Sequence, residues 1–157
     1  MIPKAVFLTR GVGSHKERLL SFEHALRDAG IEKFNLVPVS SILPPRCRLI
    51  DREEGLKMLS PGQIVYLVMA RMDSQSEERI TAGIGLAVPK NEDQIGYIAE
   101  VTSNESSETV KDRVKRLAKE MLISLGRDVD RTEAIVQSAL STKDKWTTVI
   151  SAAVFVT

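Results

Sequence analysis

The stretch from Ile80 to Val88 constrains the fold more than any other part of this chain, because apolar and small residues alternate along it without a charge. A period of two residues is that of a β-strand, whose successive side chains point to opposite faces of a sheet. One face would carry Ile80, Ala82, Ile84, Leu86 and Val88, and the other Thr81, Gly83, Gly85 and Ala87. Because the second set is small, we expect another layer of the protein to approach that face closely.

Several other segments predict strands. An almost continuous apolar run over 64–72 is typical of a buried strand, and 96–101 is predicted to pair with the strand over 80–88. The segment 34–39 contains Pro38, which cannot donate to a ladder, so this strand is expected to lie at a sheet edge or to end there. Shorter strands are expected over 6–9 and 47–50, and a hairpin is expected over 134–140 and 147–156.

Two long helices are also predicted. The first begins at Ser14, where Glu17 completes a capping box, and ends at Gly30. Its buried stripe would consist of Leu19, Phe22, Leu26 and Ala29. The second covers 108–125, and a short helical piece follows Asp51. Since strands outnumber the long helices and short turns join them, a layered antiparallel α+β fold is favoured over a doubly wound parallel sheet.

The composition fits one domain and excludes some functions. A chain of 157 residues buries about two-thirds of its surface on folding, and no repeat or linker divides it, so we expect a single domain over 1–157. Lys and Arg number 22 against 21 Asp and Glu, and aromatic residues are few, so no nucleic-acid partner is expected. The single Cys47 fits a reducing compartment and favours the cytoplasm. The longest apolar run, 152–156, is too short to cross a membrane.

Several common motifs are incomplete in this chain. Gly11-Val12-Gly13 lacks the third glycine of a dinucleotide-binding loop, whose position Lys16 occupies, so a tight turn between strand and helix is favoured. His15 and His24 are nine residues apart and would lie on opposite faces of the predicted helix, so no metal site is expected. No Gly-x-Ser-x-Gly motif occurs, but a hydrolase triad assembles in space, and linear order alone leaves that alternative open.

One longer segment of the sequence is more informative about function than these short motifs. The segment from Asn35 to Pro45, NLVPVSSILPP, resembles the self-cleavage site of the pyruvoyl-dependent arginine decarboxylases. The likeness continues, in the same order along the chain, in FEHAL from Phe22 with AGI from Ala29, in ITAGIGLAVPK from Ile80 and in GYIAE from Gly96. Several ordered segments together identify the chain as similar to this family.

The resemblance implies self-cleavage between Ser40 and Ser41. The Ser41 hydroxyl would attack the Ser40 carbonyl, and elimination from the resulting ester would split the chain into 1–40 and 41–157. Position 41 would then carry a pyruvoyl group, the expected cofactor, with no metal and no pyridoxal phosphate. Such a ketone forms a Schiff base with an amino acid and accepts the electrons that departing CO₂ leaves behind. The stiff Pro44-Pro45 exit suits a scissile bond held in a reactive geometry.

Three more residues take roles from the same resemblance. Glu100 matches the family's proton donor, a role that needs an apolar surrounding to keep the carboxyl protonated. Asn35 matches a residue linked to processing, as an amide donor to a developing oxyanion. Glu23 stands where the family usually has aspartate to bind the guanidinium of arginine, and the Ser40 carboxylate released by cleavage would assist it.

The resemblance also implies an assembly. On one straight strand, Asn35 and Ser41 would be about 20 Å apart, so Asn35 is expected to serve the Ser41 centre of a neighbouring subunit unless the chain bends sharply between them. This estimate agrees with the family's trimers, whose sites lie between subunits.

The expected molecule is therefore an antiparallel four-layer αββα sandwich that forms a homotrimer and decarboxylates L-arginine to agmatine. Two alternatives stay open. One is a pyruvoyl-dependent decarboxylase of another amino acid such as histidine, and the other is an unprocessed, non-catalytic binding module of the same fold.

Overall fold

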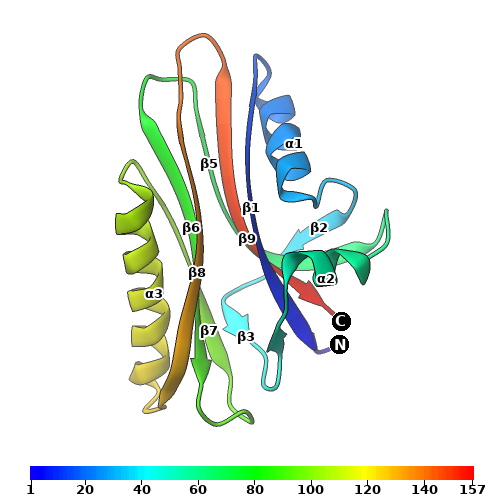
Figure 1. Ribbon diagram of the computed structural model, residues 1–157, viewed down its shortest axis with the longest axis vertical. Helices are drawn as coiled ribbons and strands as arrows, with labels where there is room; N and C mark the ends of the chain where they lie inside the picture. Colours follow the sequence, from blue (N-terminus) through cyan, green and yellow to red (C-terminus); the bar gives the residue numbers. More distant parts are fainter.

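The strands of the computed structural model, which describes all 157 residues, form two sheets that pack face to face (Figure 1). In chain order the elements are β1 (Ala5–His15), α1 (Arg18–Ala29), β2 (Asn35–Pro38), β3 (Ile42–Leu43), β4 (Arg48–Leu49), α2 (Arg52–Lys57), β5 (Ile64–Ser74), β6 (Arg79–Pro89), β7 (Gly96–Ser103), α3 (Ser107–Ser124), β8 (Val129–Leu140) and β9 (Trp146–Val156).

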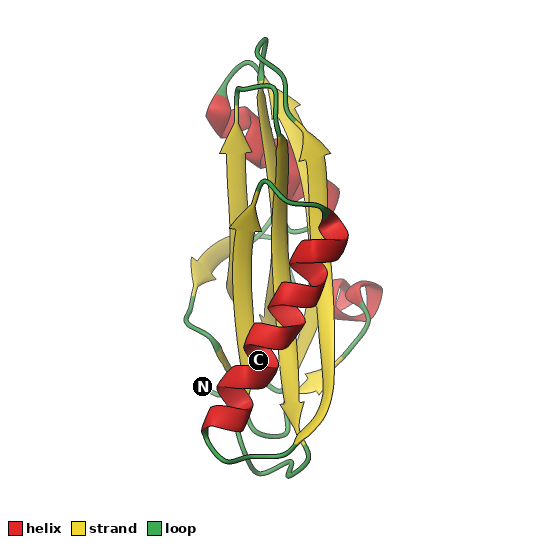
Figure 2. Ribbon diagram, turned by 90° about the vertical axis from the view of Figure 1, so that its left-hand side faces the viewer, coloured by secondary structure: helices red, strands yellow, loops and turns green.

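The layers follow the order expected from the resemblance. One sheet has five strands in the order β2-β5-β9-β1-β4, and the other has four in the order β3-β7-β6-β8. Helices α1 and α2 cover the outer face of the five-stranded sheet, and Figure 2 shows α3 lying across the outer face of the four-stranded sheet. The αββα sandwich is therefore confirmed. Its long strands are antiparallel, and only two short edge strands, β2 beside β5 and β4 beside β1, are parallel to their neighbours.

The strand over 80–88 is the centre of the four-stranded sheet. It lies in β6, which pairs with β7 on one side and β8 on the other. Ile84 and Leu86 point into the core between the sheets and are fully buried. On the opposite face, a Cβ atom at Gly83 would lie 2.6 Å from Val110 Cγ1, and one at Gly85 would lie 2.3 Å from the Val114 carbonyl oxygen. The small-residue face thus admits α3, as the alternation predicted.

Glycines also allow a helix to pack closely against β1, where the sequence predicted a turn. Gly11 and Gly13 lie inside this strand, because β1 continues to His15 and pairs with β9 along its whole length. A Cβ atom at Gly11 would lie 2.1 Å from the Ala25 carbonyl oxygen, and one at Gly13 would lie 2.3 Å from that of Ser21. The two glycines therefore let α1 pack against the strand, and the predicted tight turn is wrong.

Helix α1 begins later than predicted. Its first residue is Arg18 rather than Ser14, and Glu17 at its N-cap makes no side-chain capping bond. Leu26 and Ala29 of the predicted stripe are buried, but Leu19 is 75% exposed. The helix ends as predicted at Gly30, whose left-handed backbone (φ 79°) closes the last turn. None of the three helices is long and apolar enough to cross a membrane.

The predicted hairpin over 134–140 and 147–156 does not form. β8 pairs with β6 in the four-stranded sheet, whereas β9 lies between β5 and β1 in the other sheet. The reason is burial on both faces of β9, where every residue from Thr147 to Val156 is buried. Such a strand is stable in the middle of a sheet, while the half-exposed β8 suits an edge.

Candidate functional site

Ser40 and Ser41 lie where the chain crosses from one sheet to the other. β2 ends at Pro38 in the five-stranded sheet, and β3 begins at Ile42 in the four-stranded sheet (Figure 1). Before the crossing, the Val39 N–H donates to the Leu67 carbonyl at 2.9 Å, and after Ser40 the Ser41 carbonyl accepts from the Ile98 N–H at 2.8 Å. The Ser40–Ser41 peptide bond is thus held from both sheets.

The two serine hydroxyl groups at this crossing have no hydrogen-bond partner within the chain. Ser40 is exposed and Ser41 is half-buried, and neither side chain makes a hydrogen bond within the chain. Pro44 begins a turn in which the Cys47 N–H donates to its carbonyl at 3.2 Å, and Arg46 at that turn pairs with Asp93 at 2.8 Å. The chain is therefore fixed on both sides of two free nucleophilic groups.

This crossing corrects one expectation. Residues 35 to 41 do not form one straight strand, because β2 stops at Pro38 and the following residues change sheets. The estimate of the separation between Asn35 and Ser41 rested on that straight strand. The assignment of Asn35 to a neighbouring subunit therefore needs other support.

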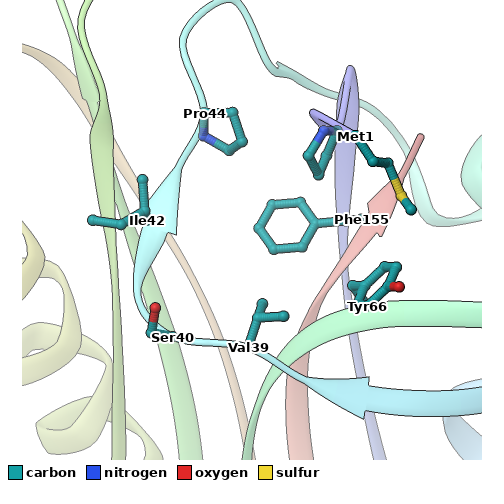
Figure 3. Close-up of a pocket in the computed structure, with 8 residues that line it drawn as sticks. Met1, Val39, Ser40, Ile42, Pro44, Tyr66 and Phe155 are labelled. Carbon is teal, nitrogen blue, oxygen red and sulfur yellow. The ribbon is translucent and has the colours of Figure 1, made fainter.

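A cavity of about 380 Å³ opens beside the crossing. Figure 3 shows its side chains converging from β3, β5, β9, the segment between β2 and β3, and the segment around Met1. It is lined mainly by apolar groups: Met1, Pro3, Val39, Ser40, Ile42, Pro44, Tyr66 and Phe155. Ser40 therefore borders a mainly apolar cavity.

Glu100 approaches the crossing through strand pairing. In the antiparallel register Ile42 lies opposite Tyr97, so Ser41 lies opposite Ile98. Glu100 is two residues farther along β7, on the same face as Ile98 and about 7 Å along the strand. Its side chain is exposed in the single chain. The apolar surrounding expected for its role is not built by this chain alone.

Glu23 and Asn35 lie elsewhere. Glu23 is on α1, has 33% of its side chain exposed and accepts a bond from Arg27 Nε at 3.2 Å. Asn35 opens β2 and donates from Nδ2 to the Gly62 carbonyl at 2.8 Å. Neither residue bonds to Ser41 or Glu100. One chain therefore brings Ser40, Ser41 and Glu100 together and leaves the other two predicted residues apart from them.

One of the two histidines lies outside the helix predicted to carry both. His15 ends β1 and His24 lies on α1, and their rings are 5.6 Å apart, so the predicted position on opposite faces of one helix is wrong. No three His, Cys, Asp or Glu side chains are grouped to hold a metal ion. Cys47 is a half-buried free thiol, and burial raises its pKa to about 11. It is therefore protonated and a weak nucleophile near neutral pH.

Two further features of the molecule were not foreseen from the sequence. The Ile98 N–H holds the Ser41 carbonyl, and only the strand register reveals that contact. Asp73, near the end of β5, has a side chain that is only 4% exposed and accepts bonds from three other side chains. The alternation of Arg71, Met72 and Asp73 at the end of an apolar strand was its one sequence signal.

Comparisons with known proteins agree with one another. The family described as pyruvoyl-dependent arginine decarboxylase matches residues 5–157. The chain is 55% identical to pyruvoyl-dependent arginine decarboxylase 2 of Archaeoglobus fulgidus, over 99% of this chain and 98% of that relative. It is 48% identical to pyruvoyl-dependent arginine decarboxylase 2 of Methanosarcina acetivorans, over 100% and 98%. It is 47% identical to a probable pyruvoyl-dependent arginine decarboxylase of Chlorobium limicola, over 98% and 97%.

A solved structure shares the fold at low identity. The structure of pyruvoyl-dependent histidine decarboxylase at pH 8 superposes with a TM-score of 0.52, over 63% of this chain and 53% of that chain. The two sequences are 11% identical over the match, so the similarity supports the fold alone.

Proposed function

The chain belongs to the pyruvoyl-dependent arginine decarboxylases, and from this membership we propose that Ser41 is the source of its pyruvoyl group. The protein is an enzyme that decarboxylates L-arginine, which gives agmatine and CO₂. The observation that supports Ser41 is the crossing at Ser40-Ser41, where hydrogen bonds to Leu67 and Ile98 hold the chain on each side of the bond that would break. A fixed geometry of this kind favours attack by an adjacent hydroxyl.

The proposed cleavage balances without any other reactant than water. The Ser41 Oγ bonds to the Ser40 carbonyl carbon while the C–N bond between the two residues breaks, which leaves an ester. Removal of the Ser41 Cα proton then breaks the Cβ–Oγ bond, so Ser40 leaves as a carboxylate and residue 41 becomes dehydroalanine. Water displaces ammonia from the imine tautomer of residue 41 and produces the pyruvoyl group.

The residues around position 41 fit such a group. Its neighbour Ile98 fixes the backbone through the Ser41 carbonyl, and Glu100 lies on the same face of β7. When present, the pyruvoyl carbonyl supplies the electron sink that decarboxylation of an amino acid requires. Glu100 is proposed to hold the proton that replaces CO₂ on the α-carbon.

Substrate binding is assigned to Glu23, with Asn35 supporting the cleavage. A carboxylate matches the two parallel N–H donors of the arginine guanidinium, and Glu23 is half-exposed on α1. Neither residue reaches Ser41 in one chain, and Glu100 is open to solvent there. We propose that a homotrimer closes the site between subunits. The cytoplasm stays our proposal for its compartment, supported by the single free thiol of Cys47.

Two other functions would give different results. A histidine decarboxylase would turn over histidine in preference, although the acidic Glu23 suits a permanently cationic side chain better. An unprocessed binding module would remain one chain of 157 residues.

The decisive test is the mass of the purified protein. We expect two species, 1–40 and 41–157, the second carrying a carbonyl that reacts with borohydride or hydrazine reagents. Ser41→Ala, which lacks the β-hydroxyl, should stay whole and inactive, while Ser103→Ala, an exchange of the same kind on β7, should cleave and decarboxylate arginine normally. A whole, inactive wild-type chain would refute the proposal. A cleaved protein that prefers histidine would refute only the assignment of the substrate.

A further inference from the structure

A polar group lies beneath α1, the helix that carries the residue assigned to bind arginine. Its centre is Asp73 on β5, whose Oδ2 accepts from Arg18 Nε at 3.0 Å. The other oxygen, Oδ1, accepts from Arg71 Nε at 3.1 Å and from the Thr148 hydroxyl at 2.6 Å. The side chain of Asp73 is 4% exposed. A carboxylate with this many donors is ionised and fixed in orientation.

The ionisation is consistent with the charges around it. Burial alone would raise the pKa of the Asp73 carboxyl, but hydrogen bonds from Thr148, Arg71 and Arg18 outweigh this effect and hold its pKa below the ordinary value. Loss of the charge at Asp73 would leave the Arg71 guanidinium, whose side chain is 32% exposed, without its anionic partner. The group is therefore built around one negative charge.

Three residues of α1 are tied to this group. Arg18 pairs with Asp73 directly, and the Ser21 hydroxyl is 2.7 Å from that of Thr148. The guanidinium of Arg71 lies over the ring of Phe22, 3.7 Å from its centroid. A stacked guanidinium at this distance contributes both packing and a cation–π attraction. The first half of α1 is thus held on the sheet through Asp73.

Glu23 directly follows Phe22, the residue on whose ring Arg71 stacks. At 100° per residue, Glu23 lies about 100° around the helix from Phe22 and about 140° from Arg18, on the flank that also carries Leu19. The opposite flank carries Asp28, which accepts from the Val12 N–H of β1 at 2.9 Å. The only hydrogen bond of Glu23 is to Arg27 of the same helix, so no bond ties Glu23 to the sheet. Its position follows that of the helix.

We infer that Asp73 is a positioning residue of the substrate site, which fixes Glu23 by holding Arg71 under Phe22 and Arg18 at the start of α1. This inference rests on the proposed function, because it takes Glu23 as the group that binds the guanidinium. Asp73 itself touches neither the substrate nor the reacting atoms.

The test is steady-state kinetics on the self-cleaved Asp73→Asn protein. The variant keeps the size of the side chain and removes its charge. We expect cleavage to be complete, KM for arginine to rise by about ten-fold and kcat to stay within about two-fold, since only binding of the guanidinium is weakened. Arg71→Met, which removes the stacked cation but keeps Asp73 bonded to Arg18 and Thr148, should raise KM in the same way.

A double-mutant cycle separates positioning from general destabilisation. If Asp73 acts through Glu23, Asp73→Asn should raise KM in the wild type but have no further effect in a Glu23→Gln background. The control is Glu105→Gln, which removes the partner of Arg113 beside α3 and should lower thermal stability without a change in KM.

The inference is overturned if Asp73→Asn leaves KM unchanged, or if it raises KM equally with and without Glu23. It is also overturned if Asp73→Asn does not fold while Arg71→Met folds with the KM of the wild type. Failure of the proposed function looks different, because the wild-type protein itself would then be whole or would not decarboxylate arginine.

Discussion

Glu100 and Asp73 are carboxyl side chains on β7 and β5, and their surroundings in one chain are opposite. Asp73 is enclosed by donors from three residues, whereas Glu100 faces solvent with no bond. An enclosed and fully bonded carboxylate maintains structure, while an open one beside a reactive centre is available to exchange a proton. The role proposed for each carboxyl group thus follows from whether hydrogen-bond donors of the protein or solvent surround it.

Glu100→Gln should separate cleavage from turnover. The amide keeps the shape of the side chain but cannot give up a proton, so we expect the chain to split after Ser40 while kcat for arginine falls by about 100-fold or more. Glu77→Gln, an exposed glutamate in the loop after β5, is the matched control and should retain full activity. Full activity of Glu100→Gln, measured as CO₂ released, would remove Glu100 from the role of acid.

Asp73 predicts how stability depends on pH. Because its pKa is lower in the folded chain than the ordinary 3.8, its charge contributes stability that is complete above 3.8 and is lost as the pH falls through the folded value. In a Ser41→Ala background, the free energy of unfolding should therefore decrease less between pH 5 and pH 3 for Asp73→Asn than for the parent protein. Urea unfolding at the two pH values measures this, and equal losses would contradict it.

Among the elements, the close contacts between helices and sheets depend on glycine. Gly85 on β6 brings that strand within reach of the α3 backbone, just as Gly11 does for β1 and α1. The alternation around Gly85 revealed this contact from the sequence, because small residues filled one whole face of a strand. The same device at Gly11 and Gly13 was mistaken for a turn, because a short Gly-x-Gly string carries no information about the strand continuing beyond it.

Gly85→Val should therefore be severely destabilising. Its Cβ would lie 2.3 Å from the Val114 carbonyl oxygen, so α3 must shift, at a cost of about 3 kcal/mol. Gly62→Ala is the control: no atom lies within 4 Å of its Cβ, and only the positive φ of 81° costs about 1 kcal/mol. Urea unfolding in the Ser41→Ala background compares unbroken chains. Gly85→Val should have a clearly lower urea midpoint than Gly62→Ala. Equal midpoints would show that α3 is not held by this contact.

The path of the chain between elements was harder to predict than the elements themselves. The strands around Pro38 and Ile64 were located correctly, and the resemblance supplied the order of the layers. Which sheet each strand enters depends on pairing between residues far apart in the chain, so the separation of β8 from β9 and the change of sheet at Ser40-Ser41 left no local signal. Candidate residues for the site could thus be proposed from the sequence, but their arrangement in space could not be predicted.

For the whole molecule, the site predicts complementation between damaged subunits. Co-expressed Ser41→Ala and Glu23→Gln chains should form mixed assemblies in which about a quarter of the sites pair an intact Ser41 with an intact Glu23 of a neighbour. Activity at low arginine should then exceed that of either variant alone. If both residues served the same chain, no mixture would recover activity, and the proposed site between subunits would be wrong.

Strands from both sides of Ser40-Ser41 are interleaved. β1 and β2 belong to the segment 1–40. β1 pairs with β9 and β2 pairs with β5, and both of these partner strands belong to 41–157. After the proposed cut between Ser40 and Ser41, these ladders and the shared core alone would keep the two pieces associated. Unfolding then releases two molecules where synthesis made one, and regaining the native state becomes a second-order encounter whose yield drops with dilution. If the chain is cut as proposed, only the uncut precursor folds in a unimolecular reaction, and the cut enzyme depends on remaining folded.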